Sequence, residues 1–439
     1  MANQRNRKRL ETPSVTKNTP HIARVELASV KLPTVSTSRV QSQSQQWVKY
    51  GEKNDFPQYL IDAEGKCAPH AAFLGLRRNL IAGEGLAFSD NIQAALEAIN
   101  DEGTADDLLE DVAGDLSVFE TFACQVVYTR NKSAIVNVYH VPSANVRPHK
   151  QLDDRGNPIG YWVSADWSNT TNCQPKFYER FDPLNIGTHV KQVDASQAAP
   201  AGSQLYFYHK RALDQPYLPQ VSYRAALTYV ELAREMGVFS LSSIVNGFSS
   251  PGIMNVASTM DDEAKRDLVY KFNQTMTGAE NASKVLLTVS DIDTITWTGT
   301  GTEDITPRIE AYNRIIVEQV SSAHRGNPML AGIQSEGASL GGDANTYATS
   351  LDVYHNTVIN PLQRPFLRFL NRVLTFNGAT EFELDIARLG LVNAAMSDDM
   401  KFKLLKPEVI ASEFGYKPED LVAAPIVAEA IPAPAAPVV

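Results

Sequence analysis

A glycine-rich stretch in the last third of the chain carries the pattern most suggestive of catalysis. Residues 337–341, GASLG, spell G-x-S-x-G, the nucleophile elbow of hydrolases, in which a buried strand leads into the serine and a helix leads out. Here the preceding residues, AGIQSEG, are polar, and the only histidine after Ser339 is His355, sixteen residues further on. A triad built from so short a segment is implausible. We therefore expect Ser339 to be a loop serine and the chain not to be an enzyme.

The remaining motifs favour neither a nucleotide site nor a metal site. The segment TGTGTED, 298–304, resembles the start of a dinucleotide fingerprint, but Asp304 stands where the third glycine belongs and would repel a pyrophosphate. No G-x-x-x-x-G-K-[ST] sequence occurs, so a phosphate-binding P-loop is absent. The eight histidines include no pair with metal-ligand spacing. We expect no cofactor and no metal.

The composition is that of a globular protein. The 439 residues are 43% hydrophobic and 21% charged, which suits several domains or one elongated subunit. No apolar run approaches the roughly 18 to 20 residues of a membrane span, so we expect no membrane contact. Cys67, Cys124 and Cys173 lie far apart and are odd in number, which indicates free thiols in a reducing compartment.

Charge is unevenly distributed along the chain. Residues 1–45 hold eight Lys and Arg against two Glu, so the net charge of −10 leaves −16 on the remainder. A basic arm on an acidic body suggests contact with nucleic acid or an acidic partner, although a solvated tail fits equally well. The candidate nucleic-acid contacts in this arm are Arg5, Arg7, Lys8 and Arg9. We expect 1–45 and the Pro/Ala-rich 424–439 to be disordered.

The first half of the chain predicts an α+β unit. Helical spacing in APHAAFLGLRRNLIAGEGL ends at Gly83, and TADDLLEDVAGDLSVFE predicts a second helix. Strand patterns follow in FACQVVYTR, AIVNVYHVP, IGYWVSADW, KFYERF and LYFYHK. We expect an antiparallel meander with helices against one face. The aromatic residues of these strands could stack on bases, but alternation favours core and cross-strand packing.

The second half predicts long helices around a small insert. Residues 222–248 predict one helix of about 40 Å, and another begins near Thr306 with Pro307 at its first position. Strand candidates SSPGIMNV, KVLLTV and DTITWTG lie between them. A third long helix follows the glycine-rich stretch, and Pro361 and Pro365 should kink it. Such helices must bury their apolar faces against neighbours, which is typical of a ring- or tube-forming subunit.

Two stretches resemble the tailed-bacteriophage portal protein (head-tail connector) family. Residues 47–86, from WVKYGEKNDFPQYL to IAGEGL, look like the family's opening, with its "GekNdfPq.L" start and "i.G.Gl" exit. The order of elements from 249 to 375 is similar to the family's second half, and the resemblance covers roughly 47 to 405. One departure concerns the helical crown. Only about 35 residues separate LDIARL from the Pro/Ala tail, so the crown should be small.

The resemblance implies an α+β, portal-like and ring-forming subunit with an antiparallel wing, long stem helices, a small α/β clip and a kinked long helix. The implied boundaries are a basic arm (1–45), the first part of the wing (46–221), a stem helix (222–248), the clip (249–303), a second stem helix (304–328), the tunnel loop (329–343), the kinked helix with the wing return (344–390), a small crown (391–423) and the tail (424–439).

The resemblance also implies which residues face DNA and partners. Glycines let the tunnel loop approach a duplex closely, and its few positive charges suit DNA that must slide. The implied DNA-channel loop residues are Gln334, Ser335, Glu336, Gly337, Ser339, Gly341, Gly342, Asp343 and Asn345. The implied clip residues facing the terminase or an adaptor are Asn255, Asp261, Asp262, Lys265 and Arg266.

As a portal protein, the chain would form a ring, typically of twelve subunits, at one capsid vertex. The ring would dock the large terminase subunit, pass double-stranded DNA during packaging and ejection, and join head to tail. Further partners would be the major capsid or scaffolding protein and head-tail adaptors, and the location would be the virion after assembly in the host cytoplasm. The alternatives are another ring-forming adaptor or structural virion protein, a serine hydrolase using Ser339, or a nucleotide enzyme. Both enzymes would be compact monomers or dimers.

Overall fold

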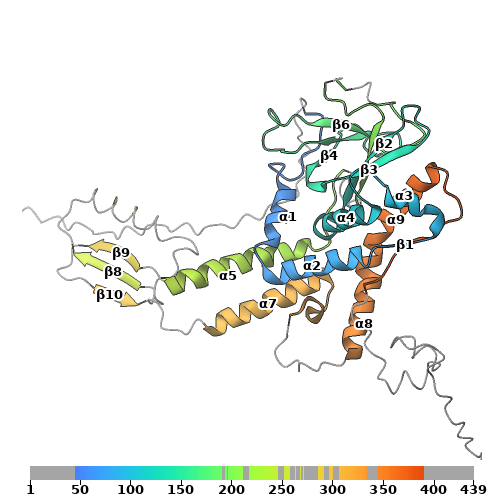
Figure 1. The fold of residues 1–439 in the computed structure, drawn as a ribbon. Helices are drawn as coiled ribbons and strands as arrows, with labels where there is room; N and C mark the ends of the chain where they lie inside the picture. Colours follow the sequence, from blue (N-terminus) through green and yellow to red (C-terminus); the bar gives the residue numbers. More distant parts are fainter. Residues whose placement is uncertain are drawn as a thin grey trace, which may run out of the picture. The chain divides into compact units, whose positions relative to one another are not determined.

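The described helices and strands belong to two compact units, one drawn from residues 235–304 and the other from residues 45–234 and 306–389 (Figure 1). The computed structural model describes residues 45–189, 193–194, 196–210, 217–245, 252–257, 263, 267, 270, 285–290, 296–299, 306–333 and 344–389. Helices and strands occupy separate stretches of this part of the chain, which confirms the predicted α+β class. The finer domain boundaries stay predictions.

The larger unit begins with helices whose ends follow from local sequence. α1 (Phe56–Glu64) is followed by α2 (Ala68–Ala82), which stops at Gly83 as predicted. A Cβ on Gly83 would lie 2.1 Å from the carbonyl oxygen of Ala387, so the chain needs glycine at this close approach. α4 (Ala105–Phe119) begins with a capping box between Thr104 and Asp107.

Short elements link these helices to the far end of the chain. β1 (Leu86–Phe88), the 3-10 turn η1 (Asp90–Ile92) and α3 (Gln93–Glu97) lie between α2 and α4. β1 pairs antiparallel with β11 (Leu384–Ile386). The pairing brings residues from both ends of the larger unit into one two-stranded sheet.

A six-stranded sheet forms the centre of the larger unit. Its strands are β2 (Phe122–Tyr128), β3 (Ile135–Val141), β4 (Val146–Pro148), β5 (Gly160–Val163), β6 (Lys176–Arg180) and β7 (Ser203–Tyr208), with the turn η2 (Ser143–Asn145) before β4. The order is β3-β2-β7-β6-β5-β4, and β6 and β7 run parallel. The predicted meander is therefore wrong. β7 lies in the middle of the sheet, between β2 and β6. The prediction failed because alternation identifies strands but not their order in the sheet.

Helices cover one face of this sheet, as predicted. α4 packs against β2 and β3, and α9 (Asn360–Phe376) packs against β2 and β7. Phe122 on β2 meets Phe366 with ring centroids 5.7 Å apart, and Tyr206 on β7 stacks on Phe369 at 4.5 Å. Together with residues of α2 these rings form the largest buried cluster among the described residues.

The predicted long helix at 222–248 begins later than expected. Ser222 and Tyr223 bond through their side chains to Glu120 and to the Val118 carbonyl at the end of α4, and a 3-10 turn, η4 (Arg224–Ala226), follows. Only then does α5 (Leu227–Val245) start. Residues 246–250 lie outside the described part.

The second predicted long helix is α7 (Thr306–His324), which starts where Pro307 indicated. Its buried residues Ile316 and Val320 pack in one cluster with Leu227 and Val230 of α5. The 3-10 turn η6 (Pro328–Ala331) follows. This part of the larger unit therefore has an apolar core of its own.

The predicted kink is a π-helical turn. α8 (Ala344–Tyr354) passes into the turn His355–Ile359 and then into α9, and the N–H of Asn360 bonds to the His355 carbonyl. Pro361 has no N–H and would clash one turn back, so the helix widens just before it. The Thr357 hydroxyl donates to the Val353 carbonyl at 2.7 Å, which also favours bending. α9 continues through Pro365.

The smaller unit contains the three predicted insert strands, β8 (Gly252–Ala257), β9 (Val285–Ser290) and β10 (Thr296–Gly299). The order is β10-β8-β9, with β8 parallel to β9 and antiparallel to β10. Across the described parts of both units, no helix combines the length and the apolar character that crossing a membrane requires.

Candidate functional site

Most of the residues predicted to face DNA or partners lie outside the described residues. Those are the loop residues Gln334, Ser335, Glu336, Gly337, Ser339, Gly341, Gly342 and Asp343, the clip residues Asp261, Asp262, Lys265 and Arg266, and the arm residues Arg5, Arg7, Lys8 and Arg9. Asn345 lies in the first turn of α8. Asn255 lies in β8, opposite Thr288 and Thr296. All these assignments stay predictions. The described residues bring together no set of His, Cys, Asp and Glu fit to hold a metal ion.

A polar cluster, the helix junction, joins α2, the end of α4, the chain leading into α5, and α7. It consists of the buried residues His70, Arg77, Glu120, Tyr223 and His324 and of Ser222, which is exposed at its edge. Glu120 ends α4 in the left-handed conformation, with φ of 55°. Its Oε1 accepts from Arg77 Nη2 at 2.7 Å, and its Oε2 accepts the Ser222 N–H at 3.0 Å. One carboxylate thus fixes α2, the end of α4 and the chain leading into α5.

The Arg77–Glu120 pair is deeply buried. Arg77 is 2% exposed and Glu120 is 8% exposed. Burial alone would lower the pKa of Arg77, but the adjacent Glu120 carboxylate raises it above its usual value. Arg77 is therefore held in its charged form, and in this buried position it depends on Glu120 for compensation.

Two histidines form the other half of the helix junction. His70 Nδ1 on α2 and His324 Nε2 on α7 are 2.9 Å apart, so one donates a hydrogen bond and the other accepts it. The His324 ring stacks between Phe73, at 5.2 Å, and Tyr223, at 4.9 Å. Burial, with the charge of Arg77, lowers the pKa of His70 to about 4. Burial likewise places the pKa of His324 well below its usual value. Both rings are neutral at pH 7.

A second buried cluster explains the GEKNDFPQ stretch before α1. Asn54 is left-handed, with φ of 66°, and its Oδ1 accepts from the Tyr50 N–H at 2.9 Å and from Arg147 Nε at 2.6 Å. Arg147 is 2% exposed and also donates to the carbonyls of Ala144, Val146 and Asn54. Its guanidinium lies 5.0 Å from the Trp167 ring centre. No carboxylate pairs with it in the described part, and burial lowers its pKa to about 9.

The sequence alone did not reveal that this stretch contacts Arg147 through Asn54. Asn54 and Arg147 are 93 residues apart, so no local periodicity connects them. The available signal was Asn54 itself, because Asn tolerates the left-handed conformation and can bond its own backbone. The cluster ties the start of α1 to β4.

Substitutions at Asn54 should separate its two roles. Asn54→Gly keeps the backbone conformation but removes the amide oxygen, so Arg147 loses an acceptor, and we expect about 2 kcal/mol of destabilisation. Asn54→Ala adds left-handed strain and should be about 1 kcal/mol worse than Gly. Asn54→Asp keeps an oxygen beside Arg147 and serves as the control. Urea unfolding measures all three, and a Gly variant as stable as the native chain would contradict the role of the oxygen.

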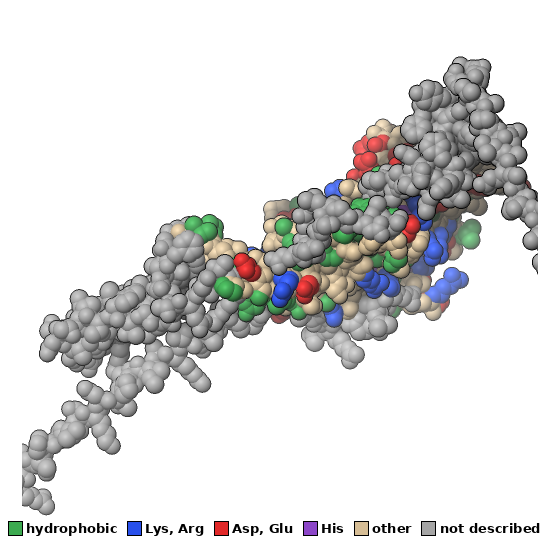
Figure 2. Space-filling model, turned by 90° about the horizontal axis from the view of Figure 1, so that it is seen from below, with side chains coloured by type: hydrophobic (Ala, Val, Ile, Leu, Met, Phe, Trp, Pro, Cys, Tyr) green, Lys and Arg blue, Asp and Glu red, His purple; other side chains and the backbone are tan. Residues whose placement is uncertain are grey.

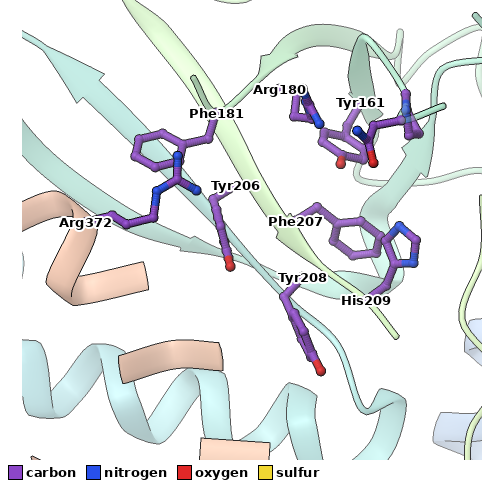
Figure 3. Close-up of a pocket in the computed structure, with 10 residues that line it drawn as sticks. Tyr161, Arg180, Phe181, Tyr206, Phe207, Tyr208, His209 and Arg372 are labelled. Carbon is purple, nitrogen blue, oxygen red and sulfur yellow. The ribbon is translucent and has the colours of Figure 1, made fainter. Parts of the chain in front are cut away.

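A cavity of about 210 Å³ lies beside β7 (Figure 3). Figure 3 shows Arg372, Phe181 and Tyr206 on one side of the strand, and Tyr161, Arg180 and Phe207 on the other. Arg180 is paired with Asp153 at 2.9 Å, and the lining of this cavity contains no Ser, Cys, Asp or Glu.

The aromatic residues beside this cavity are packed. Tyr161 is 3% exposed and lies 5.3 Å from Phe207, ring centre to ring centre, and Tyr206 stacks on Phe369. The strands therefore use these rings for core and cross-strand contacts, as alternation favoured.

Comparison with known proteins assigns the family. The family profile described as phage portal protein matches residues 74–403, which is most of the chain. No curated protein matches. Among solved structures, a chain from the virion of the native gene transfer agent particle is 14% identical, with a TM-score of 0.48, 82% of this chain covered and 94% of that chain covered.

Two further structures are similarly distant. A chain from the neck of the native gene transfer agent particle, computed with C12 symmetry, is 15% identical, with a TM-score of 0.49 and 83% and 94% coverage. An HK97 family phage portal protein from Corynebacterium diphtheriae is 11% identical, with a TM-score of 0.41 and 74% and 94% coverage. Because these structures are so distant, the family assignment rests on the profile match, which agrees with the resemblance found in the sequence. The chain belongs to the phage portal protein family.

Proposed function

We propose that this chain is the portal subunit of a tailed phage or phage-like particle, in which copies of it close into a ring at one capsid vertex. The observation that carries the proposal is the family match over residues 74–403. The proposed ring has twelve copies, the usual number for the family, and serves as the passage for double-stranded DNA during packaging and ejection. Its role is structural, and ATP hydrolysis belongs to the terminase that docks on it.

Exposed apolar side chains on the long helices support assembly. Leu241 and Ile244 on α5 are 63% and 59% exposed, and Tyr312 and Ile315 on α7 are 45% and 38% exposed. Large apolar side chains gain free energy when a neighbour covers them. Neighbouring copies in a ring would bury these positions.

The other parts of the chain take their roles from the family. We assign residues 249–303 to the clip that meets the large terminase subunit and later the head-tail adaptors, and residues 329–343 to the loop that faces DNA. The wing would meet the major capsid or scaffolding protein. The ring would assemble in the host cytoplasm and remain in the virion.

Native mass spectrometry of the purified chain, with negative-stain images of the same sample, tests the ring. We expect a closed ring of about twelve subunits with a central hole wide enough for duplex DNA. A uniform monomer or dimer across salt and protein concentrations would contradict the proposal.

Deletion of residues 334–342 tests the loop assignment. We expect the shortened chain to form rings of native size, because the deletion leaves the described helices intact, and we expect particles to package or retain much less DNA. Encapsidated DNA is measured by nuclease protection. Particles filled with a genome of normal length would contradict the assignment.

A further inference from the structure

Helix α9 exposes a row of arginines that we call the arginine ladder. Arg364, Arg368 and Arg372 follow one another at four-residue spacing, which places them on one side of the helix, and all three are exposed. The opposite side is buried by Leu362, Pro365, Phe366, Phe369, Leu370, Val373 and Leu374. The sequence contains no Asp or Glu from residue 353 to residue 380. The ladder is thus purely cationic.

None of the ladder's three guanidinium groups forms an ion pair in the part of the chain that the structure describes. At one end of the ladder Arg372 interacts with Asp182, whose pKa is lowered by a hydrogen bond from Asn185 and, to a smaller extent, by the charge of Arg372. Arg372 lies over the Phe181 ring at 4.8 Å, which holds one end of the ladder against the sheet. Three arginines on a single exposed helix face mutually repel, so an anionic surface would stabilise them.

A matching anionic surface lies elsewhere on the same unit. From residue 79 to residue 129 the sequence contains no Lys or Arg. Within this stretch α3, α4 and the loop between them carry seven exposed acidic residues, which we call the acidic surface: Glu97, Asp101, Glu102, Asp106, Asp107, Glu110 and Asp111. Two basic side chains lie beside it: His140, whose Nδ1 is 3.8 Å from Asp111, and Arg78, whose guanidinium lies against α4 at Gly114.

The two surfaces belong to different parts of the helical layer. α4 packs under β2 and β3, and β3 is an edge strand of the sheet. α9 packs under β2 and β7, on the side toward β6. Figure 2 shows one face of the molecule, on which exposed Lys and Arg side chains (blue) and exposed Asp and Glu side chains (red) both occur. Among the described residues, no ion pair joins the ladder to the acidic surface within one copy.

We propose that the arginine ladder of one copy docks on the acidic surface of the next copy. The proposal rests on the proposed ring and names two surfaces of its subunit contact. A closed ring joins each copy to the next through two different patches, so the patches must complement each other in shape and charge. A cationic helix face and an anionic helix face on one chain supply that complementarity, and opposed charges also fix the register of the contact.

Charge exchange between the two surfaces tests the contact. Arg368→Glu with Arg372→Glu places like charges across each contact, and so does Glu102→Lys with Glu110→Lys. We expect each pair to raise the protein concentration needed for half-assembly by about tenfold or more at low salt. All four changes on one chain restore opposite charges at every contact and should restore most of the assembly.

Two controls keep the test specific. Arg130→Glu with Arg155→Glu makes the same change in net charge at exposed sites off the ladder and should leave assembly unchanged. Arg368→Gln with Arg372→Gln removes the two charges without reversing them, so it should weaken assembly less than the Glu pair. This variant still tests the ladder if the Glu variant folds poorly. Circular dichroism and thermal unfolding confirm that each variant is folded.

The outcomes separate this proposal from the proposed function. If the native chain forms rings and both charge-reversed variants form them equally well, the docking contact alone is overturned. If rings are unchanged but packaged DNA falls in the arginine variant only, the ladder meets DNA and the contact is equally overturned. A native chain that forms no ring under any condition would overturn the proposed function and the contact with it.

Discussion

Replacement of Glu120 by Ala is expected to lower the free energy of unfolding by about 3–5 kcal/mol. The change removes the carboxylate that neutralises Arg77, which is 2% exposed and lies 2.7 Å from it. A buried guanidinium without a counter-charge is strongly unfavourable. The same change removes the acceptor of the Ser222 N–H, so the chain leading into α5 loses its anchor on α4. Urea unfolding of the purified chain measures the effect.

An exposed ion pair is the matched control for Glu120. Arg388 and Asp352 are 3.5 Å apart with side chains 56% and 67% exposed, so Asp352→Ala should change stability by no more than about 1 kcal/mol. The double change Arg77→Met with Glu120→Gln removes both charges and should be less damaging than Glu120→Ala alone. If Glu120→Ala were no worse than Asp352→Ala, the helix junction would not depend on this ion pair.

Elements set by nearby residues could be predicted from the sequence. The end of α2 at Gly83 and the start of α7 at Pro307 both depend on residues within one turn of the boundary. The capping box of Thr104 and Asp107 fixes α4 in the same way. The break before α9 follows from Pro361, although a π turn rather than a simple bend accommodates it.

The helix junction and the sheet order could not be predicted, because they depend on residues far apart in the chain. Arg77 and Glu120 are separated by 43 residues, and His70 and His324 by 254. β7 lies between β2 and β6 although β3, β4, β5 and β6 precede it in sequence. Alternation identifies each strand, but its neighbours are chosen by packing of the whole unit. The resemblance to portal proteins succeeded because it used the order of elements instead of contacts.

The histidine half of the helix junction predicts a loss of stability in mild acid. His70 has a folded pKa of about 4, against about 6.5 for an unfolded histidine. The unfolded chain therefore binds more protons between these values, and stability falls as pH decreases through that window. His70 alone should remove about 3 kcal/mol between pH 7 and pH 4. His324, whose pKa is also lowered by burial, acts in the same direction.

Geometry explains why the folded junction resists protons. His70 Nε2 and His324 Nδ1 have no hydrogen-bond partner among the described residues, so an added proton would be buried without an acceptor. The positive charge of Arg77 lies near His70, whereas Tyr223 is neutral because burial raises its pKa. Glu120 is occupied by Arg77 and Ser222. The protonated pair would therefore face a cation and aromatic rings.

The double variant His70→Gln with His324→Gln isolates this contribution. His149 and His355 also have pKa values lowered by burial, and they remain in the variant as an internal reference. Urea unfolding of both chains at pH 7, 6, 5 and 4 should show a steep decline in the native chain and a decline smaller by at least about 3 kcal/mol in the variant, since both histidines are removed. If the free energy of unfolding fell with pH equally in the two chains, the junction histidines would take up protons equally when folded and unfolded. The His70–His324 pair would then make no contribution to the pH dependence of stability.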